Sequence, residues 1–142
     1  MKILLAVDGS KSSDAALRAV IKERRPTGDE VRVITVLQPL LATPVPQMAA
    51  GYAPELEAER KRARELVEKS AETLRAAGFR AGAVVGQGDI RERILDEAEE
   101  WKADVIVLGS HGHGQLKRIL LGSVAESVAR HSTCSVEIVK GK

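Results

Sequence analysis

The stretch Asp104-Val-Ile-Val-Leu-Gly-Ser-His-Gly112 contains the most apolar run of the chain and passes directly into a glycine-rich loop. A short, almost wholly apolar run is typical of a central parallel strand that is covered on both faces. Further on, Gly122-Ser123 opens a helical pattern. Glycines let the backbone approach a ligand closely, and free N–H groups at a helix N-terminus attract anions. The stretch therefore predicts a buried strand that ends at a phosphate-binding loop.

This loop differs from a Walker A loop, which has four residues between its first glycine and a Gly-Lys-Ser/Thr sequence. No lysine precedes Ser123. We therefore expect a phosphate-binding loop of another kind.

Short apolar runs alternate with helical patterns along the whole chain. Strands are expected at residues 3–7, 31–37, 83–85, 105–108 and 136–139, and helices at 10–25 and 55–77 and from residues 89 and 123 onward. Right-handed crossovers then place helices on both faces of one parallel sheet. The alternation in the last run, where Glu137 lies between Val136 and Ile138, suggests an edge strand or one whose second face meets another element. The pattern predicts a single α/β domain over residues 1–142.

The starts of three of the expected helices have clear sequence signals. Asp89-Ile-Arg-Glu92 and Ser123-Val-Ala-Glu126 are capping-box patterns, with Asp89 and Ser123 as the expected N-caps. Pro54 is expected to precede the second helix, whose apolar stripe runs from Leu56 to Ala77. Residues 38–54 then form the one long irregular segment, either a cover for a ligand or a mobile surface loop.

Composition excludes several classes of function. The net charge of +2 arises from 22 basic and 20 acidic residues, a balance too even for a nucleic-acid-binding or membrane-binding surface. Aromatic residues make up 2% of the chain, which leaves little for stacking bases of single strands. Cys134 is the single cysteine, so no intrachain disulfide can form. Asp8 interrupts the first apolar run too early for a signal peptide, and we expect a cytoplasmic protein.

Four motifs occur along the chain in a characteristic order: Val7-Asp-Gly-Ser10, Ala103-Asp-Val-Ile-Val-Leu-Gly-Ser-His-Gly112, Leu120-Leu-Gly-Ser-Val-Ala-Glu126 and Cys134-Ser-Val-Glu-Ile-Val139. Together they resemble the universal stress protein family, and the resemblance covers the whole chain. It implies a Rossmann-like α/β sandwich whose five-stranded parallel sheet has the order 3-2-1-4-5. Asp8 and Gly109 then lie beside each other where the winding direction reverses, the place at which such sheets bind ligands.

The resemblance also implies a set of nucleotide-binding residues. They are Asp8, Val36, Gly109, Ser110, His111, Gly112, His113, Gln115, Gly122, Ser123 and Val124.

Several of these residues have an alternative role that is purely structural. Asp8 would accept a ribose hydroxyl or help to hold a metal ion, or would only cap the turn before the first helix. The backbone of Val36 would contact adenine while its side chain belongs to the core. Gly109 and Gly112 would bend around the phosphates or form a tight surface turn. A metal pair made of His111 and His113 lacks an evident third ligand.

The resemblance favours an ATP-binding regulatory protein, with Mg²⁺ or Mn²⁺ accompanying the triphosphate. It also implies a homodimer through the C-terminal strand and a protein partner whose identity is open. A slow ATPase or phosphotransferase is an alternative, although no base or arginine finger is evident. A nucleotide-independent interaction module is a third hypothesis, and cyclic AMP or another adenine nucleotide could replace ATP.

Overall fold

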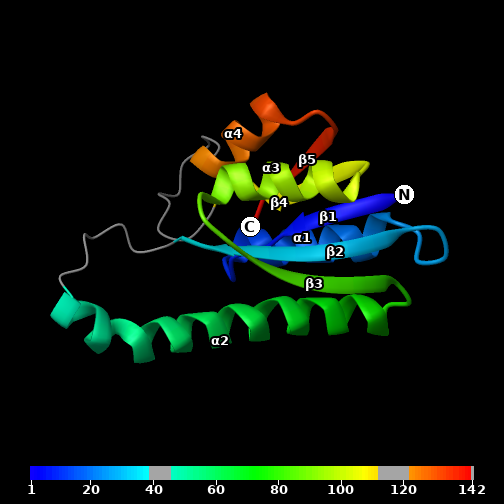
Figure 1. Cartoon of the computed structure of the whole chain (residues 1–142). Helices are drawn as coiled ribbons and strands as arrows, with labels where there is room; N and C mark the ends of the chain where they lie inside the picture. The colour runs from blue at the N-terminus through cyan, green and yellow to red at the C-terminus, as the bar shows by residue number, and fades with distance from the viewer. Residues whose placement is uncertain (39–45, 112–121, 142) are drawn as a thin grey trace.

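The computed structural model describes residues 1–38, 46–111 and 122–141, and only the backbone of residues 46–54. Five parallel strands form one sheet in the order β3-β2-β1-β4-β5 (Figure 1). The strands are β1 (Lys2–Ala6), β2 (Glu30–Leu37), β3 (Arg80–Gln87), β4 (Val105–Gly109) and β5 (Ser135–Val139). The helices of the described residues are α1 (Lys11–Glu23), α2 (Pro46–Ala76), α3 (Ile90–Trp101) and α4 (Ser123–His131). The expected α/β class, strand order and edge position of β5 are confirmed.

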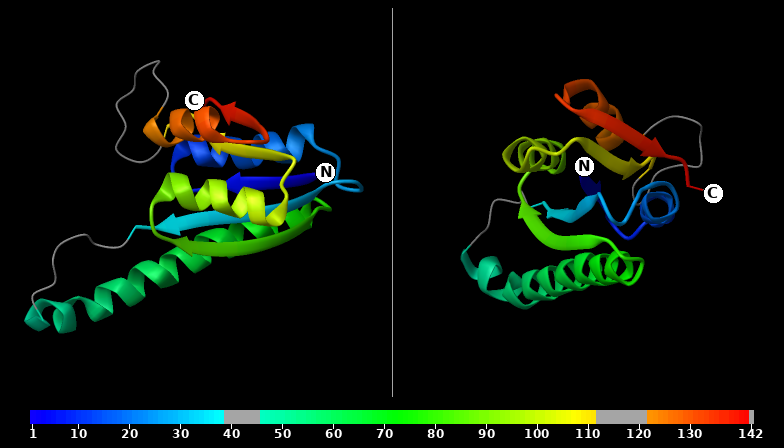
Figure 2. Two further views of the ribbon diagram at one scale, coloured as in Figure 1. Left: turned by 45° about the horizontal axis from the view of Figure 1, so that its top comes forward. Right: turned by 90° about the vertical axis from the view of Figure 1, so that its right-hand side faces the viewer.

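The central strand β1 supplies both faces of the hydrophobic core. Ile3 and Leu5 face a cluster that includes side chains of α1 and α2, and Leu4 faces a cluster built from α3 and α4. Figure 2 shows the same three layers, with α1 and α2 on one side of the sheet and α3 and α4 on the other. Because alternate side chains of a strand point to opposite faces, the apolar centre of β1, Ile3 to Leu5, is fully buried between these two helical layers.

Helix α2 differs from the expected helix at its beginning. It starts at Pro46 instead of after Pro54, so residues 46–54 of the expected irregular segment are helical, and residues 39–45 lie outside the described chain. Proline is well tolerated in the first turn of a helix, and the alanines that follow Pro46 favour helix. Pro54 removes one backbone hydrogen bond, and this cost does not end the helix.

The first half of α2 projects beyond the sheet (Figures 1 and 2). Its 31 residues span about 46 Å, whereas the eight residues of β3 span about 26 Å. Ala63, Val67 and Leu74 are buried, but Leu56 is 37% exposed. The expected apolar stripe is therefore correct from Ala63 onward and wrong at Leu56, which is exposed.

The beginning of α4 also differs from the expected helix start. Gly122, not Ser123, is the N-cap, and the side chain of Ser123 is exposed in the first turn. Glu126 forms an ion pair with Arg130 at 3.0 Å along the helix surface instead of turning back to the cap. The opening of α3 is as expected, because Asp89 accepts hydrogen bonds from the backbone N–H groups of the first turn.

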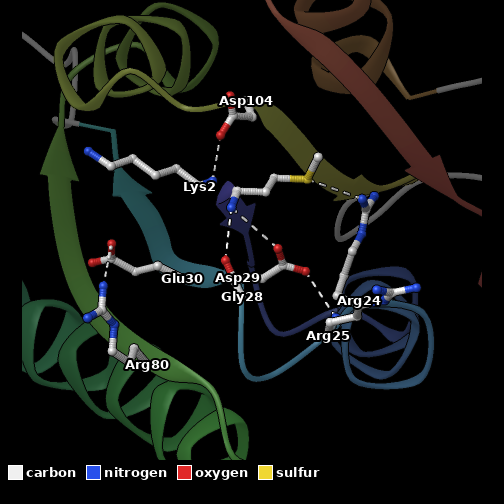
Figure 3. A network of polar contacts seen from close by, with 9 residues as sticks. Lys2, Arg24, Arg25, Gly28, Asp29, Glu30, Arg80 and Asp104 are labelled. Carbon is white, nitrogen blue, oxygen red and sulfur yellow. Dashed lines mark hydrogen bonds and ion pairs between the residues drawn. The ribbon is translucent and has the colours of Figure 1, made fainter.

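The amino edge of the sheet is held by pairs between strand starts and neighbouring turns (Figure 3). The backbone N–H of Lys2 donates to Asp104 Oδ2 at 2.7 Å. Asp29 Oδ2 accepts from the backbone N–H of Arg25 at 3.0 Å, and Asp29 Oδ1 lies 3.4 Å from the amino group of Met1. These contacts connect the start of β1 to the turn before β2 and to the turn before β4.

A buried carboxylate connects α3 to the sheet. Glu97 is 5% exposed and accepts from Arg32 of β2 at 2.6 Å and from Arg93 of its own helix at 2.7 Å. The guanidinium of Arg32 also lies 4.5 Å from the centre of the Trp101 ring. Burial by itself would raise the pKa of Glu97, but the hydrogen bonds and charges of the two arginines outweigh it and lower the pKa.

The substitution Glu97→Gln tests this connection. We expect the free energy of unfolding at pH 7 to fall by about 2 kcal/mol, because both arginines lose a charged acceptor. Because the pKa of Glu97 is lower in the folded than in the unfolded protein, its carboxylate stabilises the fold fully at pH values above the ordinary pKa of 4.5. This stabilisation is lost as the pH falls through the lowered pKa of the folded protein. The difference between wild type and variant should therefore shrink in acid.

Urea unfolding measured between pH 3 and pH 8, a range that spans these values, provides the comparison. Glu100→Gln is the matched control, since Glu100 is exposed on the same helix, and it should change the unfolding free energy by less than about 0.5 kcal/mol. A Glu97→Gln variant as stable as wild type at pH 7 would contradict the role assigned to the two arginine contacts.

Candidate functional site

A cavity of about 480 Å³ lies at the carboxyl edge of the sheet, between the ends of β1 and β4. At this point the order of the strands reverses, and the chain continues from β1 and from β4 toward opposite faces of the sheet. Ligand sites of proteins commonly have this size, and open α/β sheets bind ligands at this reversal. The lining comes from the ends of β1, β2 and β4 and from the first turns of α3 and α4. It consists of Ala6, Val7, Asp8, Ser13, Ile34, Thr35, Val36, Gln38, Ile90, Arg91, Ile94, Leu108, Gly109, Ser110, Gly122, Ser123, Val124 and Ala125.

The turn from β1 into α1 places Asp8 at this cavity. Asp8 Oδ1 accepts from the backbone N–H of Ser10 at 2.9 Å, and Gly9 between them takes a φ of 84°, in the left-handed region that favours glycine. The backbone N–H of Asp8 donates to Ser13 Oγ at 3.3 Å. Asp8 therefore does stabilise the turn, as its structural alternative predicts, while its exposed carboxylate also lines the cavity.

Gly109 lies where β4 meets the first turn of α1. A Cβ atom at Gly109 would lie 2.5 Å from the backbone carbon of Ser12 and 2.6 Å from its Cβ. Ser12 is itself buried in this contact. Glycine is therefore required at this position by the close approach of two elements of the fold, whether or not a ligand is bound.

The helices that begin at the carboxyl edge differ in how their N-termini are capped. Ser10 Oγ accepts from the backbone N–H of Ser13 at the start of α1, and Asp89 Oδ1 accepts from two N–H groups at the start of α3. The N-cap of α4 is Gly122, which has no side chain with which to accept such a bond. The positive end of the α4 dipole thus opens toward the cavity without a side-chain cap from Gly122.

The two ends of the loop between β4 and α4 are held together. The backbone N–H of Gly122 donates to the carbonyl of Ser110 at 2.7 Å, and the N–H of Ser110 donates to Val139 of β5 at 2.8 Å. The carbonyl of His111 accepts from Ser10 Oγ at 3.4 Å, and its ring Nδ1 lies 3.0 Å from Ser110 Oγ. These bonds position the first turn of α4 beside the ends of β4 and β1.

The structure brings many of the expected site residues together. Those that line the cavity are Asp8, Val36, Gly109, Ser110, Gly122, Ser123 and Val124, and His111 is adjacent to Ser110. Gly112, His113 and Gln115 lie outside the described residues.

Sequence reasoning missed other residues of the lining, among them Ser13, Gln38 and Arg91. Ser13 lies in the first turn of α1 and Gln38 directly follows β2, and neither position has a distinctive sequence signal. Arg91 had one signal, because a cation in the first turn of a helix opposes the helix dipole.

A metal ion would find few protein ligands here. The described residues contain no group of three histidine, cysteine, aspartate or glutamate side chains that could hold a metal. Asp8 is the one carboxylate among the lining residues of the described chain. Mg²⁺ is commonly held by one or two carboxylates together with phosphate oxygens and water, so the lining fits a metal that arrives with a phosphate ligand.

Fold and cavity together define an α/β protein of the Rossmann-like class with a site at the sheet reversal. The sequence model of the universal stress protein family matches residues 1–140. Universal stress protein YxiE of Bacillus subtilis is 30% identical over 145 residues, which cover 98% of each chain. The chain belongs to the universal stress protein family.

Solved structures agree with this assignment. The structure of MJ0577, a universal stress protein of Methanocaldococcus jannaschii, is 31% identical with a TM-score of 0.83 and covers 99% of this chain and 96% of its own. A universal stress protein solved in complex with cAMP is 25% identical with a TM-score of 0.68 and covers 100% of this chain and 98% of its own. In the part of the chain that the structure describes, no helix has the length and apolar character to cross a membrane.

The substitution Gly109→Ala separates the structural role of this glycine from any contact with a ligand. We expect the ligand-free protein to lose about 1–3 kcal/mol of unfolding free energy, because the new methyl group overlaps backbone atoms of Ser12. The matched control is Gly82→Ala in β3, where an added Cβ meets nothing within 4 Å. Urea unfolding without nucleotide measures both, and equal stability of the two variants would show that the close approach relaxes freely.

Proposed function

We propose that this protein is a regulatory protein that binds an adenine nucleotide, ATP together with Mg²⁺, in the cavity at the carboxyl edge of the sheet. The observation that carries the proposal is the first turn of α4, which opens on this cavity with glycine as its N-cap. Backbone N–H groups at such a terminus bind phosphate well. The solved family member in complex with cAMP supports an adenine nucleotide as the ligand.

The phosphates would lie at the α4 end of the cavity. The N–H groups of Ser123 and Val124 belong to the first helical turn and have no partner within the helix. Glu126 does not oppose an anion at the N-cap, because it pairs with Arg130 on the helix surface. We include Gly112, His113 and Gln115 in the phosphate site on the family motif alone.

The nucleoside would lie across the ends of β1 and β2. Asp8 would accept a ribose hydroxyl, since its carboxylate is exposed at the end of β1 and lines the cavity there. The backbone of Val36, near the end of β2, would contact the adenine. Mg²⁺ would neutralise the triphosphate, held by phosphate oxygens and water, and Asp8 is the carboxylate that the described lining could offer it.

The residues of the lining favour a protein that binds ATP without hydrolysing it appreciably. Phosphoryl transfer needs a group that orients the nucleophile and cations placed around the transferred phosphate. Within the described part of the lining, Asp8 is the one acidic and Arg91 the one basic residue, and Arg91 stays protonated and cannot serve as a proton acceptor. A cradle of backbone donors holds the nucleotide, and the bound state would present a changed surface to a protein partner.

We also propose a homodimer through β5. This strand is at the edge of the sheet, where its outer backbone groups can pair with a second copy. The charge of Glu137 does not oppose such pairing, because Glu137 forms an ion pair with Arg24 of α1 at 2.6 Å.

Two substitutions at Gly122 test the phosphate site. The backbone of Gly122 has φ −64° and ψ 156°, which suits Asn and Asp as N-caps. Gly122→Asp would place a carboxylate where the phosphate binds, and we expect calorimetric titration with ATP and Mg²⁺ to show at least about tenfold weaker binding. Gly122→Asn is nearly identical in shape but uncharged, so it should weaken binding much less.

The wild-type titration decides the proposal itself. No heat of binding at millimolar ATP with Mg²⁺ would contradict it, as would equal affinities for the Asp and Asn variants. Thermal unfolding without nucleotide is the control for folding. Gly122 is buried, so either side chain must be accommodated there, and because Asp and Asn have nearly the same shape the two variants should unfold at similar temperatures.

A further inference from the structure

The side chain of Arg91 has no structural role in the described part of the chain. It is exposed in the first turn of α3 and lines the cavity, and among the described residues no acidic side chain pairs with its guanidinium. Its neighbour Arg93 is different, because it donates to Glu97 at 2.7 Å. Two arginines of one helix turn thus have distinct surroundings, one within the fold and one at the cavity.

The position of Arg91 is unfavourable for the helix alone. Its positive charge lies next to the positive end of the α3 dipole, whereas acidic residues are preferred in a first turn. Asp89 caps this turn through hydrogen bonds to the backbone N–H groups of Arg91 and Glu92 at 3.0 and 3.1 Å. A residue that opposes its local structure and faces a cavity is a candidate for a function at that cavity.

The cavity has two ends of different chemistry. The first turn of α4, bonded to the end of β4 through Ser110, provides backbone donors at one end. The first turn of α3 packs on the other end, where Ile90 and Ile94 belong to the same apolar cluster as Ile34 and Val36 of β2. If phosphates lie at α4, the base lies at the β2 and α3 end, which is where Arg91 stands.

Among the lining residues that the structure describes, no aromatic side chain is present to stack on a base. Trp101 lies at the opposite end of α3, next to Arg32, and Phe79 is buried in the core on the other face of the sheet. A planar guanidinium can take this part, because it stacks on aromatic rings and attracts their electron-rich faces.

We propose that Arg91 is a specificity residue that stacks its guanidinium on the purine base, while the aliphatic side chains of β2 and α3 cover the base from the sheet. This inference rests on the proposed function, in which the backbone of Val36 is the one contact to the base. It adds a side chain that recognises the base. Arg91 contacts the base and not the phosphates, so its contribution is the same for a nucleoside and a nucleoside triphosphate.

Titration of Arg91→Ala and wild type with adenosine, AMP and ATP with Mg²⁺ tests this assignment. We expect about fivefold weaker binding of the variant for all three ligands, the factor that corresponds to about 1 kcal/mol. Arg91→Lys should weaken binding nearly as much, because a lysine keeps the charge but not the planar group. Arg18→Ala, which removes an exposed arginine of α1, is the control and should bind as wild type does.

The outcomes separate the two proposals. A loss that grows with the number of phosphates, or full retention of affinity by Arg91→Lys, would make Arg91 a phosphate ligand and overturn the stacking assignment. Unchanged affinities of Arg91→Ala, with wild type binding normally, would overturn it while leaving the proposed function intact. If wild type bound none of the three ligands, the proposed function itself would be contradicted. Thermal unfolding without ligand should show no loss of stability in Arg91→Ala, because the helix dipole opposes the arginine.

Discussion

The close approach of α1 to the end of β4 is the contact on which the site depends. Ser12 lies against Gly109, and an added Cβ at Gly141, after β5, would likewise lie 2.7 Å from Ser12 Cα. Two glycines from different parts of the chain therefore make room for one helical turn. This contact sets how near the ends of β1 and β4 lie to each other, and so it shapes the cavity before any ligand is considered.

The fold followed from the sequence because its determinants are local. Apolar runs such as Val105–Leu108 and the Pro, Gly and Asp signals between them indicated five strands and the helices that connect them. The strand order needed the family resemblance, since periodicity does not show which strands pair. The errors occurred where two local signals competed, as at Pro54, which was expected to precede a helix but lies within one, and at Ser123, a good N-cap residue beside the glycine that takes this position.

The site was predictable in part. Asp8 and Gly109 follow strands that end at the sheet reversal, so motif and topology agree on them. The structural role of Gly109 could not be predicted, because its contact with Ser12 joins positions that are far apart in the sequence. The position of Arg91 was also not predictable from the sequence, since the packing of α3 on β2 brings it to the cavity.

The bond between the Gly122 N–H and the Ser110 carbonyl makes the chain leave and re-enter the framework at nearly the same place. The entropic cost of closing a loop rises only slowly with its length, by about 0.6 kcal/mol for each doubling. Insertions and replacements between these two residues therefore place little burden on β4 or α4. Changes in the length of the chain between them can therefore leave the framework around β4 and α4 as it is.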